Sequence, residues 1–181
     1  IWSDTPGALT SLGKVKATSG KAAVAALTEV DLPVLVDGWS ALDVLVIYDA
    51  DTGKLSQEQR IALRSWIAGG GRLIVVGGTS FQRTLSGLAD LTPVGATGTT
   101  TVSIKPLSTA VGTSFGQQIS PDALVATGSL AGDARVLYAT QDIPLIAWRQ
   151  LGHGRVDFLA ADPGLEPLRS WQAIPALWMQ I

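Results

Sequence analysis

The sequence contains no cysteine and only one histidine, His153. The absence of cysteine excludes disulfide bonds, thiolate metal sites and cysteine nucleophiles, although it is compatible with any redox compartment. A single histidine excludes a histidine-rich metal centre. No apolar run approaches the roughly 20 residues that a membrane helix needs. We therefore expect no direct membrane insertion by this segment.

Charged residues are also scarce, at 15% of the chain, whereas hydrophobic residues make up 46%. This balance excludes intrinsic disorder and a coiled coil. The 13 basic and 15 acidic residues include no basic block, so we expect no nucleic-acid partner. The length of 181 residues suits one compact domain. Because the chain begins at Ile1 and ends in an apolar stretch, we interpret residues 1–181 as a single domain of a longer protein.

The clearest structural pattern is a strand, a helix and a second strand. Residues 42–48 and 72–76 are β-branched and apolar runs, which are typical of strands buried on both faces of a parallel sheet. Between them, Ser56 and Gln59 have capping-box spacing and open a helix that three glycines end at residues 69–71. This βαβ unit predicts two parallel strands joined by a right-handed crossover.

The rest of the chain predicts an excursion and a strand meander. Residues from about 95 to 130 are rich in Thr and Gly, which indicates extended structure and loops. The last third predicts strands at 135–139, 143–150 and 155–160, with a tight turn at Gly152-His153-Gly154. We therefore expect a three-layer α/β domain with a mostly parallel central sheet and antiparallel additions at the C-terminal meander.

Polar residues follow three of the predicted strands. In an open α/β sheet, ligands bind outside the carboxyl ends of the strands, so these positions are candidates for a binding site. The candidate ligand-binding residues are Asp49, Asp51, Gly77, Gly78, Thr79, Ser80 and Asp162.

The run Gly77-Gly78-Thr79-Ser80 has two interpretations. It resembles a nucleophile elbow with Ser80 as nucleophile, or a backbone nest for an anion. A serine nucleophile needs a general base, normally histidine, and His153 lies in a predicted turn away from these strand ends. The alternative, which we favour, is that the glycines make a tight turn and that Ser80 or Thr79 caps the next helix.

The acidic residues Asp49, Asp51 and Asp162 also have two interpretations. Their carboxylates are suited to a hard cation, or to a general acid and base pair. Alternatively, they are ordinary loop residues, because Asp favours turns by bonding its own backbone, and Asp51-Thr52-Gly53 has that pattern. We favour this alternative, and we assign no catalytic residue, no metal and no cofactor.

Several stretches resemble the class I glutamine amidotransferase-like domains, which have a flavodoxin-like fold. The resemblance covers more than half of the chain, and its most specific part is the helix, triple glycine, strand and double glycine of residues 63–78. The other matching stretches are residues 42–47, Leu55-Ser56, residues 91–94, residues 144–147 and residues 152–163. The closing stretch resembles versions found in large bacterial membrane-anchored proteins.

Active members of that family carry a cysteine on the elbow, and a histidine and an acid after a late strand. Here the elbow position reads Gly77-Gly78-Thr79-Ser80, and the late strand is followed by Ala161-Asp162-Pro163. The resemblance thus implies a flavodoxin-like sandwich that is catalytically degenerate, on the extracytoplasmic face of a bacterial membrane protein; the alternative is a cytoplasmic location.

The first functional hypothesis is a non-catalytic binding or scaffold module of a larger bacterial envelope protein. Its partners would be other domains of the same chain or another protein. One alternative is a serine hydrolase that uses Ser80 with an acidic partner in place of histidine, although a carboxylate is a weak base for a hydroxyl. The other alternative is a domain that senses a small ligand or a cation at the strand ends.

Overall fold

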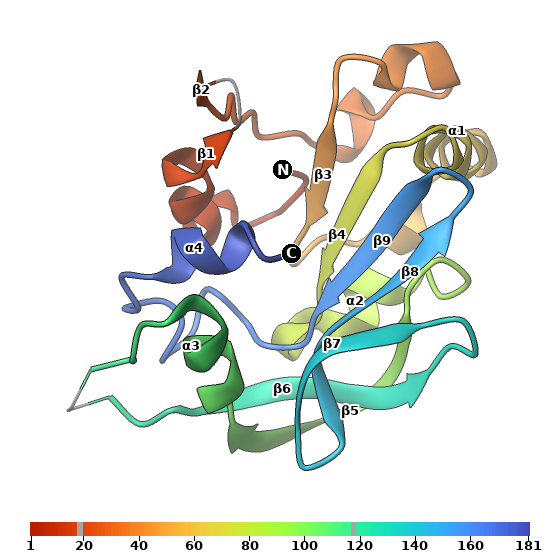
Figure 1. Cartoon of the computed structure of the whole chain (residues 1–181). Helices are drawn as coiled ribbons and strands as arrows, with labels where there is room; N and C mark the ends of the chain where they lie inside the picture. Colours follow the sequence, from red (N-terminus) through yellow and green to blue (C-terminus); the bar gives the residue numbers. More distant parts are fainter. Residues whose placement is uncertain (18–19, 117–118) are drawn as a thin grey trace.

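The computed structural model describes residues 1–17, 20–116 and 119–181 (Figure 1). Its main element is a five-stranded mixed sheet in the order β3-β4-β9-β8-β7. Neighbours are parallel among the first three strands, and antiparallel from β9 to β8 and from β8 to β7. The strands are β3 (Val44–Ile47), β4 (Arg72–Val76), β9 (Gly154–Leu159), β8 (Ile143–Leu151) and β7 (Arg135–Thr140).

The predicted βαβ unit is confirmed as β3, α1 (Gln57–Ala68) and β4, with β3 and β4 parallel. The capping box is present: the Gln59 amide donates to Ser56 Oγ at 3.2 Å, and the Ser56 amide donates to Gln59 Oε1 at 3.0 Å. Trp66, on the buried face of α1, lies 5.5 Å from the ring of Trp39 in η3 (Val36–Trp39). The capping box fixes the start of α1, and the helix packs on η3 and on β9 at one face of the sheet.

The predicted excursion contains β5 (Val94–Ser103), α3 (Lys105–Val111) and β6 (Asp122–Leu130). β5 and β6 form an antiparallel ribbon of their own, apart from the main sheet. Residues 117–118 of the excursion lie outside the described part of the chain. The ribbon reaches the main sheet through β6, because the Ala126 amide donates to Ala160 O at 2.9 Å, directly after β9.

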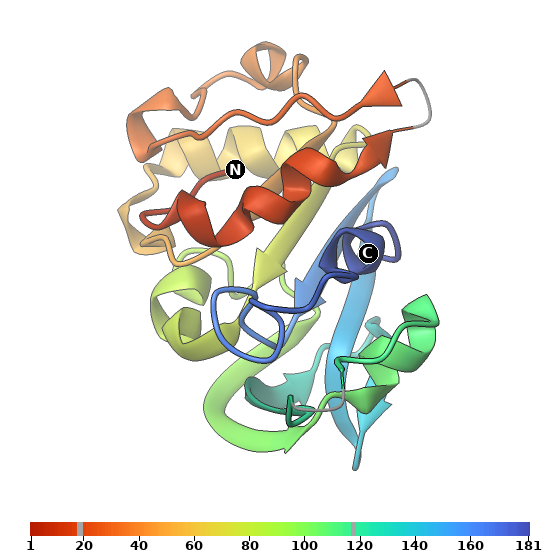
Figure 2. The same cartoon turned by 90° about the vertical axis from the view of Figure 1, so that its left-hand side faces the viewer.

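The two faces of the main sheet are covered differently. Figure 2 shows α1 behind the sheet, while η1 (Pro6–Lys14) and α4 (Ile174–Trp178) lie in front of it. The N-terminal segment also extends the edge at β3, since the Trp2 amide donates to Val46 O at 2.9 Å. The remaining short elements are β1 (Lys16–Ala17), β2 (Gly20–Lys21), η2 (Glu29–Asp31), η4 (Thr52–Lys54), η5 (Gly78–Ser80) and α2 (Phe81–Leu85).

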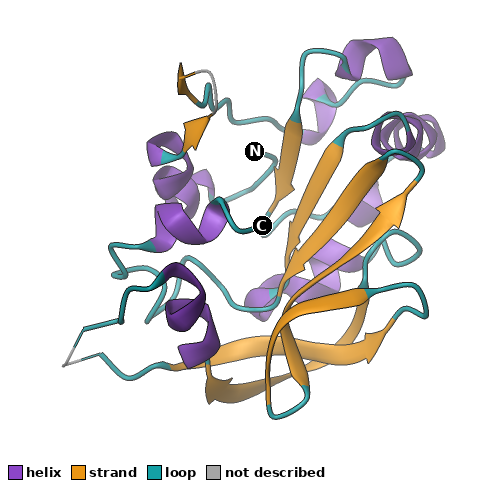
Figure 3. Cartoon of the chain, viewed as in Figure 1, coloured by secondary structure: helices purple, strands orange, loops and turns teal. Residues whose placement is uncertain are grey.

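The prediction of a three-layer flavodoxin-like sandwich is wrong. The sheet is mixed and ends in an antiparallel meander, and helices do not form a layer on each face (Figure 3). α1 has 12 residues, whereas α2, α3 and α4 have five, seven and five. After β9 the chain passes through Pro163, Gly164 and Pro167, which oppose a long helix at the place where the second helical layer would form.

Candidate functional site

The carboxyl ends of β3, β4 and β9 meet at one edge of the sheet. Because these strands are parallel and in register, the residues that follow them are brought together. Tyr48 and Asp49 follow β3, Gly78 follows β4, and Asp162 follows β9 closely. We call Tyr48, Asp49, Gly78 and Asp162 the strand-end cluster. Three of its four members were among the residues predicted from the sequence.

A buried hydrogen bond between Tyr48 and Asp162 lies at the centre of this cluster. The Tyr48 hydroxyl donates to Asp162 Oδ1 at 2.7 Å, and the Gly164 amide donates to the same oxygen at 2.8 Å. Both side chains are buried. Tyr48 was not predicted as a site residue, because this tyrosine ends an apolar run and was interpreted as part of the core. The available signal was its hydroxyl group, which needs a partner when a tyrosine is buried.

The two glycines of the elbow are needed for packing. A Cβ on Gly78, which has φ +57°, would lie 2.7 Å from Asp162 Oδ2, and a Cβ on Gly77 would lie 2.7 Å from Phe158 Cζ. Their backbone amides donate to Leu159 O at 2.8 Å and Ala160 O at 3.1 Å. These amides are thus engaged within the fold, so the arrangement is unlike an anion nest.

Thr79 and Ser80 lie after the glycines, on η5 and at the start of α2. Thr79 is exposed and Ser80 is half-buried. Ser80 takes the N-cap position of α2, but its side chain makes no capping hydrogen bond. His153 lies in the turn before β9, at the opposite end of the sheet, where its amide donates to Ala68 O at 2.8 Å. The structure therefore does not bring a histidine to Ser80.

Asp49 belongs to an exposed set of ion pairs at the rim of the cluster. The Thr5 hydroxyl donates to Asp49 Oδ2 at 3.0 Å, and Arg83 Nη1 lies 3.4 Å from Asp49 Oδ1. Arg83 also pairs with Asp4. Since Arg83 and Asp4 are about half exposed, these pairs contribute about 1 kcal/mol or less.

Asp51 is used in a turn, and its side chain does not join Asp49 and Asp162. Its Oδ1 accepts a hydrogen bond from the Gly53 amide at 3.2 Å at the start of η4. Within residues 1–17, 20–116 and 119–181, no three acidic or histidine side chains are grouped closely enough to hold a metal ion. The geometry gives the cation hypothesis no support.

The Tyr48→Phe variant is expected to be about 2 kcal/mol less stable, because it removes a hydrogen bond to a buried carboxylate. Burial raises the pKa of Tyr48, and the hydrogen bond to Asp162 acts in the same direction. A native tyrosine with a raised pKa keeps its proton above about pH 10, where the unfolded chain loses it. The contribution of Tyr48 is therefore complete below about pH 10 and is lost as the pH rises further.

Urea unfolding at about pH 7 and across the alkaline range above pH 9 measures this effect. Tyr48→Phe should flatten the alkaline fall in stability, whereas Tyr138→Phe, on β7 outside the cluster, should leave it unchanged. An alkaline fall of equal slope in wild type and Tyr48→Phe would contradict the assignment.

Comparison with known protein families identifies the family to which this chain belongs. The family described as Domain of unknown function (DUF7408) matches residues 16–179, which is most of the chain. The chain belongs to the DUF7408 family. No curated protein matches it.

Solved structures resemble this DUF7408 domain in fold. Cytoplasmic protein STM3548 from Salmonella typhimurium is 18% identical with a TM-score of 0.69, over 97% of this chain and 84% of that protein. Cytoplasmic protein STM1381 from Salmonella typhimurium LT2 is 17% identical with a TM-score of 0.67, over 94% and 82%. Exo-beta-1,4-mannosidase Op5Man5 from Opitutaceae bacterium strain TAV5 is 15% identical with a TM-score of 0.52, over 87% of this chain and 27% of that one.

These findings correct two predictions that came from the resemblance. Assignment to the class I glutamine amidotransferase-like domains is wrong, since the matching family is DUF7408 and the sheet of the DUF7408 domain is mixed, with a strand meander. The membrane-associated, extracytoplasmic location is contradicted by the two Salmonella structures, which are described as cytoplasmic proteins. In the described part of the DUF7408 domain, no helix has the length and apolar character needed to cross a bilayer.

Proposed function

We propose that this domain is a non-catalytic binding module. The observation that carries the proposal is the use of the strand-end cluster within the fold, where a catalytic group would be expected in an open α/β sheet. Asp162 is engaged by the Tyr48 hydroxyl and the Gly164 amide, and it fills the space beside Gly78. These contacts assign Asp162 Oδ1 and the Gly77 and Gly78 amides to the fold, which supports a structural use of the cluster.

The proposal also concerns the larger protein that contains the domain, its partners and its cellular location. The fold recurs over 27% of the longer mannosidase chain, which supports its use as one module of a larger protein. The partners we propose are accordingly other domains of the same chain or a separate protein, in addition to small molecules. The description of the two Salmonella proteins as cytoplasmic supports a cytoplasmic setting.

A serine-reactive fluorophosphonate probe tests the absence of catalysis. We expect no adduct on Ser80 and no turnover of a panel of ester and amide substrates, because among the described residues no base is hydrogen-bonded to the Ser80 hydroxyl. Ser80→Ala should behave like wild type, and Thr79→Ala serves as the matched control on the neighbouring exposed hydroxyl. Labelling or turnover that Ser80→Ala abolishes and Thr79→Ala retains would overturn the proposal in favour of a serine hydrolase.

A further inference from the structure

An apolar groove lies on the face of the main sheet opposite α1. Its volume is about 420 Å³, within the range of roughly 300–1,000 Å³ that small-molecule sites occupy. Val44, Val46 and Ile74 form its floor, because register partners point to the same face of a sheet. Trp178 and Ile181 contribute to it from α4 and the residues after it.

The walls of the groove offer few polar groups. The indole nitrogen of Trp178 donates to Ser11 Oγ at 3.0 Å, so the polar atom of this side chain already has a partner. Arg72 is the one charged side chain among the described residues that line the groove. It lies at the amino end of β4, opposite Val44 in the register. The groove therefore combines an apolar surface with the Arg72 guanidinium at one end, while the terminal ammonium of Ile1, which also lines the groove, donates to Ala25 O at 2.7 Å.

Positive charge is in excess around Arg72. Arg72 Nε donates to Asp157 Oδ2 at 2.9 Å, and Arg155 Nε donates to Asp157 Oδ1 at 2.7 Å. Two guanidinium groups thus share a single buried carboxylate. Within the described residues, the hydrogen bonds of Arg72 use only Nε, and 36% of its side chain is exposed. Its two terminal nitrogens remain for a ligand.

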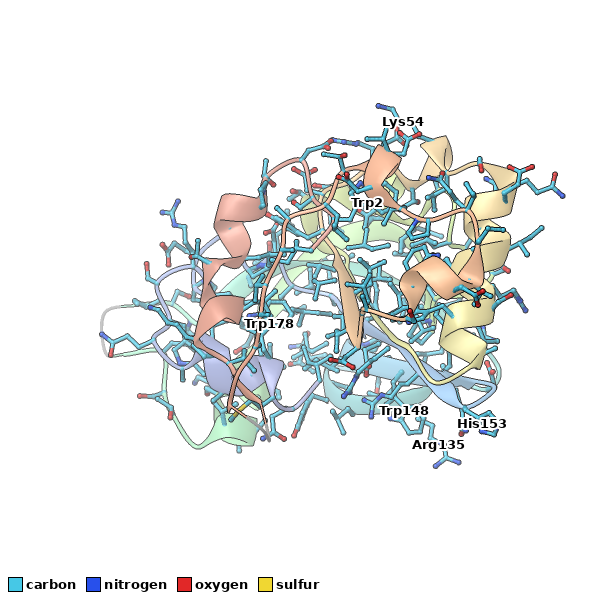
Figure 4. The ribbon with its side chains drawn as sticks, turned by 90° about the horizontal axis from the view of Figure 1, so that it is seen from above. Trp2, Lys54, Arg135, Trp148, His153 and Trp178 are labelled. Atoms are coloured by element: carbon cyan, nitrogen blue, oxygen red, sulfur yellow. The ribbon has the colours of Figure 1, made fainter. Side chains whose placement is uncertain are left out.

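A third arginine continues this charge along the same face. Trp148 of β8 lies between two guanidinium groups, at 4.5 Å from Arg155 and 5.5 Å from Arg135 of β7. Figure 4 shows Arg135 and Trp148 next to each other, away from Trp178. Arg135 and Arg155 do not line the groove, but Arg155 is the register partner of Arg72 on this face, so the sheet beside Arg72 carries a positive potential that favours an anion.

We propose that the groove binds a free long-chain fatty acid, with its carboxylate on Arg72 and its alkyl chain over Val44, Val46 and Ile74. The inference deepens the proposed binding function and rests on it. A bound peptide would bring an amide and a carbonyl at nearly every residue, and the apolar side chains that line the groove offer these groups no partners. A fatty acid has one polar group, at one end, and this matches Arg72, the one charged side chain in the described lining. A guanidinium presents two parallel N–H groups to a carboxylate, which favours a carboxylate over a neutral head group.

Titration calorimetry with laurate below its micellar concentration tests the proposal. We expect saturable binding of laurate, at least tenfold weaker binding of dodecyltrimethylammonium, whose apolar chain is one carbon longer and whose charge is opposite, and no measurable binding of butyrate. Absence of laurate binding would overturn the proposal, and so would equal affinity for laurate and dodecyltrimethylammonium.

Two variants and one control locate the site. Val44→Glu places a carboxylate in the groove at a position that is 43% exposed in the folded chain, and Arg72→Gln removes the cation. Each should weaken laurate binding at least tenfold while thermal unfolding remains cooperative. Lys54→Gln removes one positive charge on η4, beyond the carboxyl end of β3 (Figure 4), and should bind laurate like wild type.

Val44→Glu keeps the test valid if Arg72→Gln unfolds, since Val44 does not pair with Asp157. Undiminished laurate binding by folded Val44→Glu would overturn the assignment to this groove. The laurate titration and the fluorophosphonate labelling test different proposals. If laurate does not bind and Ser80 is not labelled, only the fatty-acid site is rejected. If Ser80 is labelled, the non-catalytic binding module is rejected.

Discussion

Asp162→Ala is expected to lower the free energy of unfolding by about 3 kcal/mol, because it leaves two donors, the Tyr48 hydroxyl and the Gly164 amide, without their acceptor, at about 1–3 kcal/mol each. The same substitution opens space against Gly78, whose conformation is fitted around this side chain. Urea unfolding monitored by tryptophan fluorescence measures the loss. The effect should be among the largest of any substitution of a polar side chain at this edge of the sheet.

Two comparisons separate this explanation from a general effect of removing an aspartate. Asp162→Asn keeps an oxygen that can accept from Tyr48 and Gly164, so it should recover part of the stability. Asp51→Ala removes only the cap of η4 and should cost about 1 kcal/mol or less. If Asp162→Ala and Asp51→Ala unfold at the same urea concentration, Asp162 does not have the structural role described above.

The part of the strand-end cluster that sequence analysis predicted depends on strands that are easily recognised. The runs at 42–48 and 72–76 are apolar and β-branched, and they pair in parallel as β3 and β4. The rule that carboxyl ends of parallel strands meet therefore predicted that Gly78 and Asp162 would be neighbours, and Asp49 lies at the end of β3 on the same edge.

Residues slightly farther from the strands could not be placed by the same rule. Asp51 lies two residues beyond Asp49, which has φ +46°, and this local backbone conformation directs the chain into the turn at η4. Ser80 likewise follows Gly78 at φ +57°. One backbone angle in the left-handed region redirects the following residues, and the identity of the amino acid predicts such an angle only weakly for Asp.

The covering of the sheet was predicted less well than the strands for a different reason. A three-layer arrangement requires helices on both faces, and the segment 6–14 has helical features such as Pro6 near its start. It forms η1, a 3-10 helix with non-helical angles at Leu9, so it covers the sheet without forming a regular layer. The excursion was predicted as extended structure and loops, and it contains the long strands β5 and β6 together with the helix α3, which was not predicted. The Thr and Gly residues of β5 show little alternation of apolar and polar residues, so the sequence does not predict the register in which β5 pairs with β6.

Gly154→Ala is expected to have the largest effect of any single substitution considered for this domain. A Cβ on Gly154 would lie 1.9 Å from Ile67 O and 2.3 Å from Gly71 O. Both atoms belong to the backbone at the end of α1, so no side-chain rotation relieves the clash, and α1 must move away from β9. Overpacking costs about 1–3 kcal/mol when side chains adjust and more when the backbone must shift. We therefore expect a loss of more than 3 kcal/mol or failure to fold.

Gly132→Ala is the matched control, because a Cβ at that position meets no atom within 4 Å. It should be neutral, or stabilise the protein by up to about 1 kcal/mol by restricting the unfolded chain. Thermal unfolding of both variants beside wild type distinguishes lost space from a general effect of removing glycine. A tight turn was predicted at Gly152-His153-Gly154, and of its two glycines only Gly152 has a positive φ, at +60°. Gly154 is constrained by space, so melting of Gly154→Ala at the wild-type temperature would show that α1 does not lie this close to β9.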